Sequence, residues 1–184
     1  MKHIPLIAAL MCAAAPAFAT SETCPAATID EDRRAALMAQ VRVAPNAMEA
    51  RLITNQLWEM WATAPDAHAQ EMLDLGMERR RISDLDKAIR SFDAVIAYCP
   101  EYAEGYNQRA FVRFMRQDYI GALEDLEAAI ARSPEHIAAI TGKALTLIGL
   151  ERDVEAQILL REALKMNPWL SERRFLTPLQ GNPL

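Results

Sequence analysis

The hydrophobic positions of the chain recur at steps of three and four residues, the spacing that places them on one face of an α-helix. The whole sequence has six glycines, and no segment alternates apolar and polar residues with the period of two that a half-buried strand requires. The pattern therefore predicts an all-α fold. In the stretch 47–62 the apolar face holds Leu52, Ile53, Leu57, Trp58, Met60 and Trp61.

Prolines divide the first helical region into a pair. A predicted helix at 27–43 ends at Pro45, and a second at 47–62 ends at Pro65. The spacing of this pair does not match the period of the region that follows it. We therefore interpret 20–65 as an N-terminal helical hairpin that acts as a degenerate or capping unit.

Three prolines follow one another at equal intervals, and three alanines keep the same step. A fixed period of roughly 34 residues is typical of a solenoid built from helical hairpins. Each repeat then contributes two short helices that bury one face against the next repeat. The prolines are Pro100, Pro134 and Pro168, and the alanines are Ala88, Ala122 and Ala156. The repeat region is assigned to 66–168, and its three repeats cover about 69–101, 103–135 and 137–169.

The second repeat carries the clearest motif. It reads Tyr106-Asn107-Gln108-Arg109-Ala110, then Asp118-Tyr119, then Ala122-Leu123-Glu124-Asp125-Leu126, then Pro134. With these anchors the chain resembles the tetratricopeptide repeat family over more than half of its length. The resemblance implies a right-handed superhelical stack of three helical hairpins that binds other proteins. The third repeat departs from the family at Glu151-Arg152-Asp153-Val154, so we expect a less tightly packed turn there.

The segment 169–184 follows the last repeat. Its first part, 169–176, mixes apolar and charged residues and predicts a short C-terminal helix that caps the open end of the stack. Residues 177–184 are expected to form a frayed tail.

The first residues have the features of a signal peptide. Lys2 provides a positive start, 4–16 is apolar but short for a membrane span, and Ala17-Phe18-Ala19 fits a signal-peptidase site. We predict that 1–19 is removed after Ala19 and that the mature protein is periplasmic; a retained membrane anchor is the alternative. No second apolar run of membrane length follows, so no membrane span is expected after cleavage.

The charge balance bears on possible partners. The sequence has 20 Lys and Arg residues against 25 Asp and Glu residues, a net charge of −5. Nonspecific binding to nucleic acid depends on neutralising phosphates with basic side chains. We therefore expect no nucleic-acid partner.

Two cysteines, Cys24 and Cys99, lie beyond the leader. An even number of cysteines in an oxidising compartment favours a disulfide, with two free thiols as the alternative. The bridge would close a loop of about 75 residues and stabilise the fold by about 4 kcal/mol in the entropic model.

The sequence contains no recognisable catalytic or cofactor-binding motif. His68 and His136 have no second His or Cys at metal-ligand spacing, and both are expected at the surface near helix starts. Gly142-Lys143 lacks the preceding glycine of a phosphate-binding loop. We predict no catalytic residue, no metal, no cofactor and no enzymatic activity.

Arginines on the first helix of the second repeat allow two interpretations. Arg109, Arg113 and Arg116 lie along one stripe of that helix. They could form a cationic strip for an acidic peptide, or they could pair with carboxylates inside the fold. We favour the second interpretation for Arg109, with Asp125 as its partner, and leave Arg80 and Arg81 open.

In tetratricopeptide stacks the first helix of each hairpin lines a concave groove, and the resemblance places the candidate partner-binding residues there. Together they would form an apolar groove with an amide and a basic rim, although the apolar members could instead be core residues. The carboxylate clamp of chaperone-tail-binding members is absent at the matching positions. The candidates are Leu73, Met77, Arg80, Asn107, Phe111, Phe114, Met115, Thr141, Leu145 and Ile148.

These patterns predict a periplasmic adaptor or scaffold that binds a polypeptide segment in its concave groove. The alternative is a chaperone-like accessory factor for exported proteins, for example one that serves an envelope complex or cytochrome maturation. The two differ in the number of partners, because an adaptor has one stoichiometric partner and a chaperone has many weak clients.

Overall fold

The computed structural model describes residues 23–27 and 29–178, and within them it is all-α, as predicted. The N-terminal hairpin consists of α1 (Glu31–Arg42) and α2 (Ala47–Ala62). The predicted signal peptide 1–19 lies outside the described residues. Three further hairpins follow: α3 (Ala67–Arg81) with α4 (Leu85–Tyr98), α5 (Ala103–Met115) with α6 (Tyr119–Arg132), and α7 (Ile137–Gly149) with α8 (Asp153–Met166).

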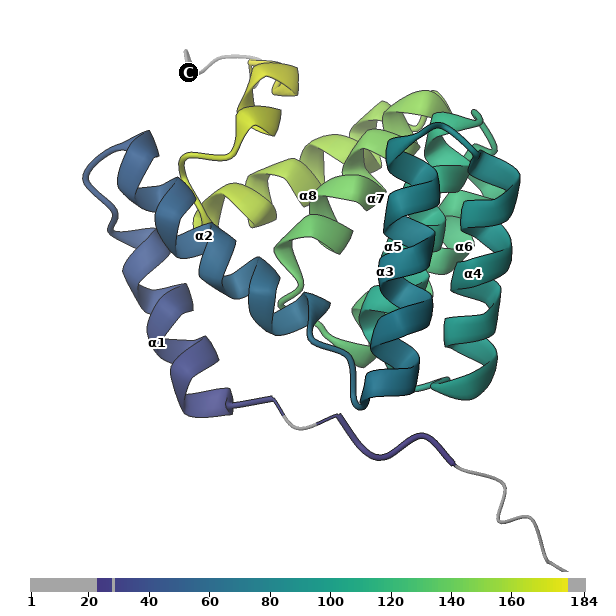
Figure 1. The fold of residues 1–184 in the computed structure, drawn as a ribbon. Coiled ribbons are helices and arrows are strands. Elements are labelled where there is room, and N and C mark those ends of the chain that lie inside the picture. The colour runs from purple at the N-terminus through teal and green to yellow at the C-terminus, as the bar shows by residue number, and fades with distance from the viewer. Residues whose placement is uncertain (1–22, 28, 179–184) are drawn as a thin grey trace, which may run out of the picture.

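The three hairpins stack in sequence order, each helix packing on the next from α3 to α8 (Figure 1). Small residues allow this close packing: Ala88, Ala122 and Ala156 have no exposed surface. Gly76 on α3 serves the same purpose, because a Cβ atom there would collide with the buried Phe92 ring of α4. The predicted stack of helical hairpins is therefore confirmed.

The turn inside each of the three repeat hairpins has one residue in the left-handed region of the backbone. Ser83, Gln117 and Glu151 have φ angles of 61°, 61° and 60°, and they occupy the same position in successive repeats. The closing hydrogen bond repeats as well: the Arg152 N–H donates to the Leu147 carbonyl at 2.9 Å, as the equivalent N–H does in the other two turns. The third turn therefore keeps the backbone geometry of the other two, while the expectation that its side chains pack less tightly stays a prediction.

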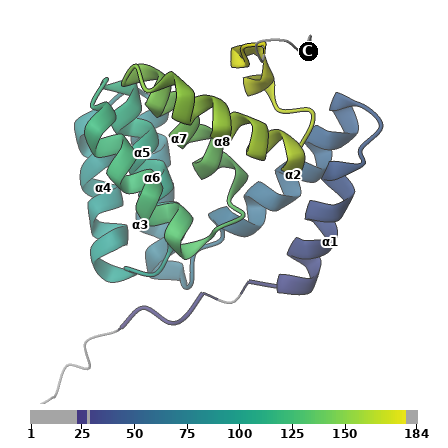
Figure 2. The same cartoon turned by 180° about the vertical axis from the view of Figure 1, so that it is seen from behind.

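The N-terminal hairpin does not stack on α3 and α4. It folds back toward the opposite end of the solenoid, where α1 contacts α8 (Figures 1 and 2). Leu37, Met38, Val41 and Leu57 form a core with Ile137 at the start of α7, and Trp169 packs against this core. The expected capping unit is thus a hairpin, but it joins the last repeat instead of covering the first.

Directed hydrogen bonds hold the N-terminal hairpin in this position. The Trp169 indole Nε1 donates to the Ala44 carbonyl at 2.8 Å, and the Asn167 amide donates to Thr54 Oγ1 at 3.2 Å. At the other end of α2, the buried Tyr102 hydroxyl donates to the Trp61 carbonyl at 2.8 Å. Both ends of α2 are therefore attached to the repeats.

The segment after α8 covers the outer edge of the last repeat, and the short helix that its pattern predicts is a 3-10 helix, η1 (Ser171–Phe175). Gln157 donates to the Phe175 carbonyl at 2.9 Å, and Arg161 donates to the Thr177 carbonyl at 2.8 Å. Of the predicted tail 177–184, only 177–178 are described.

The structure joins Cys24 and Cys99 in a disulfide. The bridge ties the segment before α1 to the end of α4, and so fixes the N-terminal region to the first repeat. In the described part of the chain, no helix has the length and hydrophobicity that crossing a bilayer requires.

Candidate functional site

A cleft lies between α2 on one side and α5 and α7 on the other. It has two adjoining hollows of about 270 Å³ and about 610 Å³, which share the lining residues Trp58, Ala138, Thr141 and Glu172. The smaller hollow, called here the inner hollow, lies against the repeats, and the larger lies between α2, the start of α7 and the segment after α8. The cleft exists because the N-terminal hairpin crosses to the last repeat and forms a second wall.

The walls of the inner hollow are largely apolar. Phe111 and Phe114 of α5 and Leu145 of α7 line one side, and Trp58 of α2 lines the other. Phe111 is 49% exposed and Trp58 is 42% exposed. Exposed aromatic side chains within a concave site are a common feature of binding surfaces, because they offer a large apolar area with few degrees of freedom.

A chain of hydrogen bonds supports the polar end of the inner hollow. Arg80 donates to the Gln108 side-chain carbonyl, and the Gln108 amide donates to the carboxylate of Glu104. Asn107 donates to the same carboxylate at 3.0 Å. Glu104 itself has no exposed surface. The network fixes the two amides that line the hollow, since a buried carboxylate must keep its donors.

His136 completes this network from the side of α7. Its Nε2 lies 2.8 Å from Glu104, and its Nδ1 accepts from the Ala139 N–H at 3.3 Å, so that Nε2 is the nitrogen that donates. Trp61 of α2 stacks on the imidazole with ring centroids 4.3 Å apart. The prediction that His136 lies at the surface is wrong, because the residue is fully buried. His68 is exposed, as expected.

Arg80 is the cation of the inner hollow. Its guanidinium lies over the Phe111 ring, 4.8 Å from the centroid, and it forms no ion pair within the described residues. Burial lowers the pKa of Arg80, and the nearby carboxylate of Glu104 opposes this shift. An arginine in this position offers donors and positive charge to a ligand.

Six of the ten predicted groove residues line the inner hollow together: Arg80, Asn107, Phe111, Phe114, Thr141 and Leu145. Leu73 does not, because it is fully buried in the core between α3 and α4. Met77 packs against the same core, and Met115 and Ile148 lie outside both hollows. Leu73 is therefore corrected from a groove residue to a core residue.

Sequence reasoning missed the second wall. Trp58 was assigned to the apolar side of its helix, and Glu172 to a capping segment, yet both line the two hollows. Two buried polar atoms of lining residues, Trp61 Nε1 and Thr146 Oγ1, also have no hydrogen-bond partner within the described part. Such atoms are rare in folded proteins and call for an explanation.

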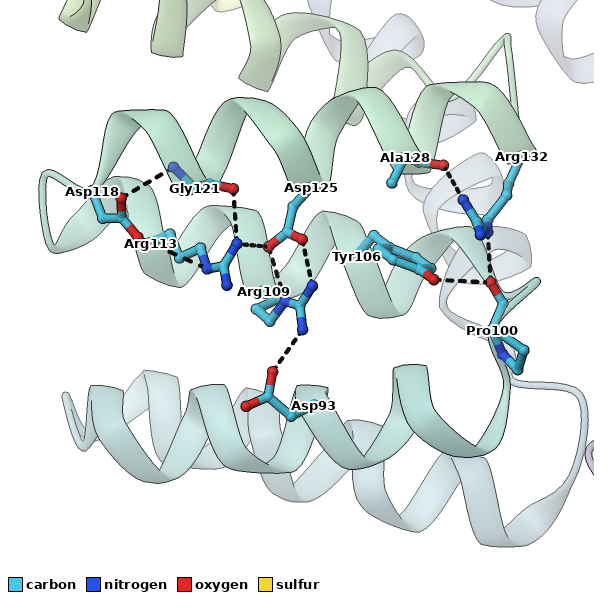
Figure 3. A network of polar contacts seen from close by, with 10 residues as sticks. All are labelled: Asp93, Pro100, Tyr106, Arg109, Arg113, Asp118, Gly121, Asp125, Ala128 and Arg132. Carbon is cyan, nitrogen blue, oxygen red and sulfur yellow. Dashed lines mark hydrogen bonds and ion pairs between the residues drawn. The ribbon is translucent and has the colours of Figure 1, made fainter.

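The arginine stripe of α5 is paired inside the fold, as favoured for Arg109 (Figure 3). Arg109 binds both oxygens of Asp125, at 2.9 and 2.6 Å, and reaches Asp93 of α4 at 2.7 Å. Arg113 lies 3.1 Å from Asp125, and Arg116 pairs with a carboxylate of α4 at 2.6 Å. These contacts account for the stripe without a peptide ligand.

In the part of the chain that the structure describes, no group of three His, Cys, Asp or Glu side chains is placed to hold a metal ion.

Comparisons with known proteins agree with this architecture. No family model matches the chain. Mouse tetratricopeptide repeat protein 36 is 36% identical over 66 residues, which is 36% of each protein. A TPR repeat-containing protein of Rhizobium etli is 27% identical over 114 residues, covering 60% of this chain and 54% of the relative. The chain thus spans about a third to a half of the length of these curated relatives.

Solved structures show the same fold. The TPR2B domain of yeast Sti1, in a complex with pHsp70, is 26% identical with a TM-score of 0.55, covering 59% of this chain and 90% of that domain. MamA is 19% identical with a TM-score of 0.51, covering 81% of this chain and 78% of the MamA chain. The stack of helical hairpins, its regular period and these likenesses together define the class: the chain has the repeat pattern and the fold of tetratricopeptide repeat proteins.

Proposed function

We propose that the protein is an exported interaction adaptor that binds a polypeptide segment in the cleft between α2 and the repeats. The likeness to the TPR2B domain in its complex with pHsp70 supports peptide binding by this class of fold. The observation that carries the proposal is the two-walled cleft, in which Trp58 and Phe111 line the same hollow from separate elements and remain partly exposed.

The chemistry of the cleft favours a mainly apolar segment. Phe111, Phe114 and Leu145 offer apolar contacts for one or two large side chains in the hollow of about 270 Å³. Asn107 lies at the wall and is held by Glu104, so its position is set before a ligand arrives. A fixed polar group costs little conformational entropy on binding and orients the bound chain.

The leader and the cysteines support the proposed location. A positively charged start, a short apolar stretch and a small-residue cleavage site at 17–19 are the features of export by a signal peptide. The disulfide between Cys24 and Cys99 fits an oxidising compartment such as the periplasm. The buried carboxylate of Glu104, which lies behind the inner hollow, is occupied by structural donors, in keeping with a binding role for the cleft.

Photo-crosslinking in the native compartment tests the proposal. The photoreactive amino acid p-benzoylphenylalanine placed at Phe111 exchanges one aromatic ring for another inside the cleft. The same amino acid placed at Phe175, which is 37% exposed and lies outside both hollows, is the matched control. We expect one dominant adduct from position 111 that is absent from position 175.

The other outcomes are informative as well. Many weak adducts from position 111 would favour the chaperone-like alternative. A dominant adduct that forms equally from both positions would show that the cleft is not the binding site. If the protein purified from the periplasmic or membrane fraction still carried its leader, cleavage after Ala19 would be contradicted.

A further inference from the structure

We propose that the outer edge of the first repeat binds an acidic amphipathic helix of a partner protein. This surface, called here the α3–α4 edge, consists of Met72, Leu75, Arg79, Ile82, Lys87 and Arg90. None of these residues lines either hollow of the cleft, so the α3–α4 edge is a separate surface.

The α3–α4 edge is the end of the stack that lacks a cap in the described structure. The other end is covered by residues 171–178, and the N-terminal hairpin packs on the last repeat instead of the first (Figure 1). A solenoid normally closes its ends with polar outer faces. Here Leu75 is 47% exposed and Ile82 is 50% exposed, so this end presents apolar surface.

The interfaces between repeats show what such an edge binds. Where α4 packs on α5, carboxylates of α4 pair with arginines of α5: Asp93 with Arg109 at 2.7 Å, and Asp86 with Arg116 at 2.6 Å. Where α6 packs on α7, a glutamate of α6 pairs with Lys143 at 2.9 Å. In each case the incoming helix supplies the acid and the receiving edge supplies the cation.

The α3–α4 edge keeps this positive character but replaces two charges with apolar residues. Leu75 and Ile82 occupy the positions of the first repeat that Arg109 and Arg116 occupy in the second. They remove the need for ion pairs at those two positions and leave an apolar strip in their place. A helix that docks here would therefore gain more from apolar burial than α4 gains on α5.

Positive charge lies on the side of the apolar strip that faces α4, and Glu71 and Glu78 lie on its other side. A shallow hollow of about 330 Å³ is lined by Arg79, Lys87 and Arg90, and its lining includes no carboxylate. Lys87 and Arg79 share one acid, Asp84, at 2.8 and 4.0 Å. Arg90 has no ion pair within the described part. The hollow beside the strip thus has more cations than acids, and charge complementarity along this side favours an acidic helix.

A panel of labelled helical peptides tests the proposal with the purified full chain. Each peptide is as long as α4, which has 14 residues, and carries leucines at helical spacing on one face. The flanks of this face carry glutamate, glutamine or lysine. Binding is measured by fluorescence anisotropy. We expect the glutamate peptide to bind more tightly than the glutamine peptide, and the lysine peptide to bind most weakly.

Variants locate the binding surface. Leu75→Asp should weaken the glutamate peptide about tenfold or more, because it places a charge on the apolar strip and repels the flanks. Arg90→Glu should reverse the preference between the glutamate and lysine peptides. Both positions are exposed, so the fold should persist, which circular dichroism checks. Val154→Asp, on the exposed side of α8, is the matched control and should leave binding unchanged.

Three results would overturn the proposal: no binding by any peptide at 1 mM, equal binding by the glutamate and lysine peptides, or unchanged binding after Leu75→Asp. A second copy of this chain is the alternative occupant of the edge, and analytical ultracentrifugation tests it. Self-association that increases with concentration and is lost in Leu75→Asp would assign the edge to a second copy instead. The cleft variant Phe111→Ser should bind the panel like the unmodified protein, so failure of this proposal and failure of the proposed cleft function are distinguishable.

Discussion

Tyr102→Phe tests whether α2 is anchored to the repeats as the structure shows. The Tyr102 side chain is 5% exposed, and its hydroxyl donates to the Trp61 carbonyl at 2.8 Å. That carbonyl belongs to the last turn of α2, where carbonyl groups have no partner within the helix. Burial raises the pKa of the Tyr102 hydroxyl, so it remains a neutral donor at physiological pH.

The expected loss follows from the buried acceptor. Removing the hydroxyl leaves the Trp61 carbonyl without its donor, which costs about 2 kcal/mol. For a chain of this size that corresponds to a Tm decrease of roughly 4–8 °C. Tyr106→Phe is the matched control: its hydroxyl donates to the Pro100 carbonyl at 3.1 Å at an exposed site, and its loss should cost less than about 0.5 kcal/mol.

Urea unfolding followed by two signals gives the measurement. The three tryptophans, Trp58, Trp61 and Trp169, all belong to the N-terminal hairpin or to the core that packs against it, so fluorescence reports this interface. Far-UV circular dichroism reports all helices. We expect Tyr102→Phe to lower the fluorescence midpoint clearly more than Tyr106→Phe does. Equal midpoints in the two variants would refute the anchoring of α2 at the start of α5.

Three further predictions concern the repeats. Gln117→Gly should stabilise the protein by up to about 1 kcal/mol in thermal melts. Glycine relieves about 1–2 kcal/mol of strain at this left-handed position but adds conformational entropy to the unfolded chain. Gln117→Ala should bring no such gain. Ala122→Leu should destabilise by about 1–3 kcal/mol through overpacking, and an unchanged Tm would contradict the tight hairpin contact. The hydrogen bond from the Ala69 N–H, and a second from Tyr98, lower the pKa of Asp66 below 3.8. Because folding lowers this pKa, the ionised Asp66 carboxylate stabilises the fold above pH 3.8, and this stabilisation is lost as the pH falls through the lowered pKa. Asp66→Asn should therefore flatten the dependence of Tm on pH below about 4.

The repeats could be predicted because their causes are local and recurrent. A small residue at Ala88, Ala122 and Ala156 is needed wherever two helices of a hairpin touch, and all three have no exposed surface. The pairing of Arg109 with Asp125 could be predicted for the same reason, since both lie within one hairpin. Short sequence separation and repetition make such contacts visible in the sequence.

The second wall of the cleft depends on contacts that sequence spacing does not reveal. Trp169 and Ala44 are 125 residues apart, and their hydrogen bond helps to place α2 opposite the repeats. The burial of His136 arises from Glu104 one repeat earlier and from the Trp61 ring of a different hairpin. Leu73 illustrates the opposite error, because its helical position matched the groove while its side chain completes the core.

Crosslinking from both walls tests the two-walled cleft most directly. In separate variants, p-benzoylphenylalanine is placed at Trp58 on α2 and at Phe111 on α5, and the attached peptides are identified by mass spectrometry. Because both residues line the hollow of about 270 Å³, we predict that they capture the same segment of the same partner. Capture of unrelated partners by the two positions, or capture from Phe111 alone, would contradict a shared cleft.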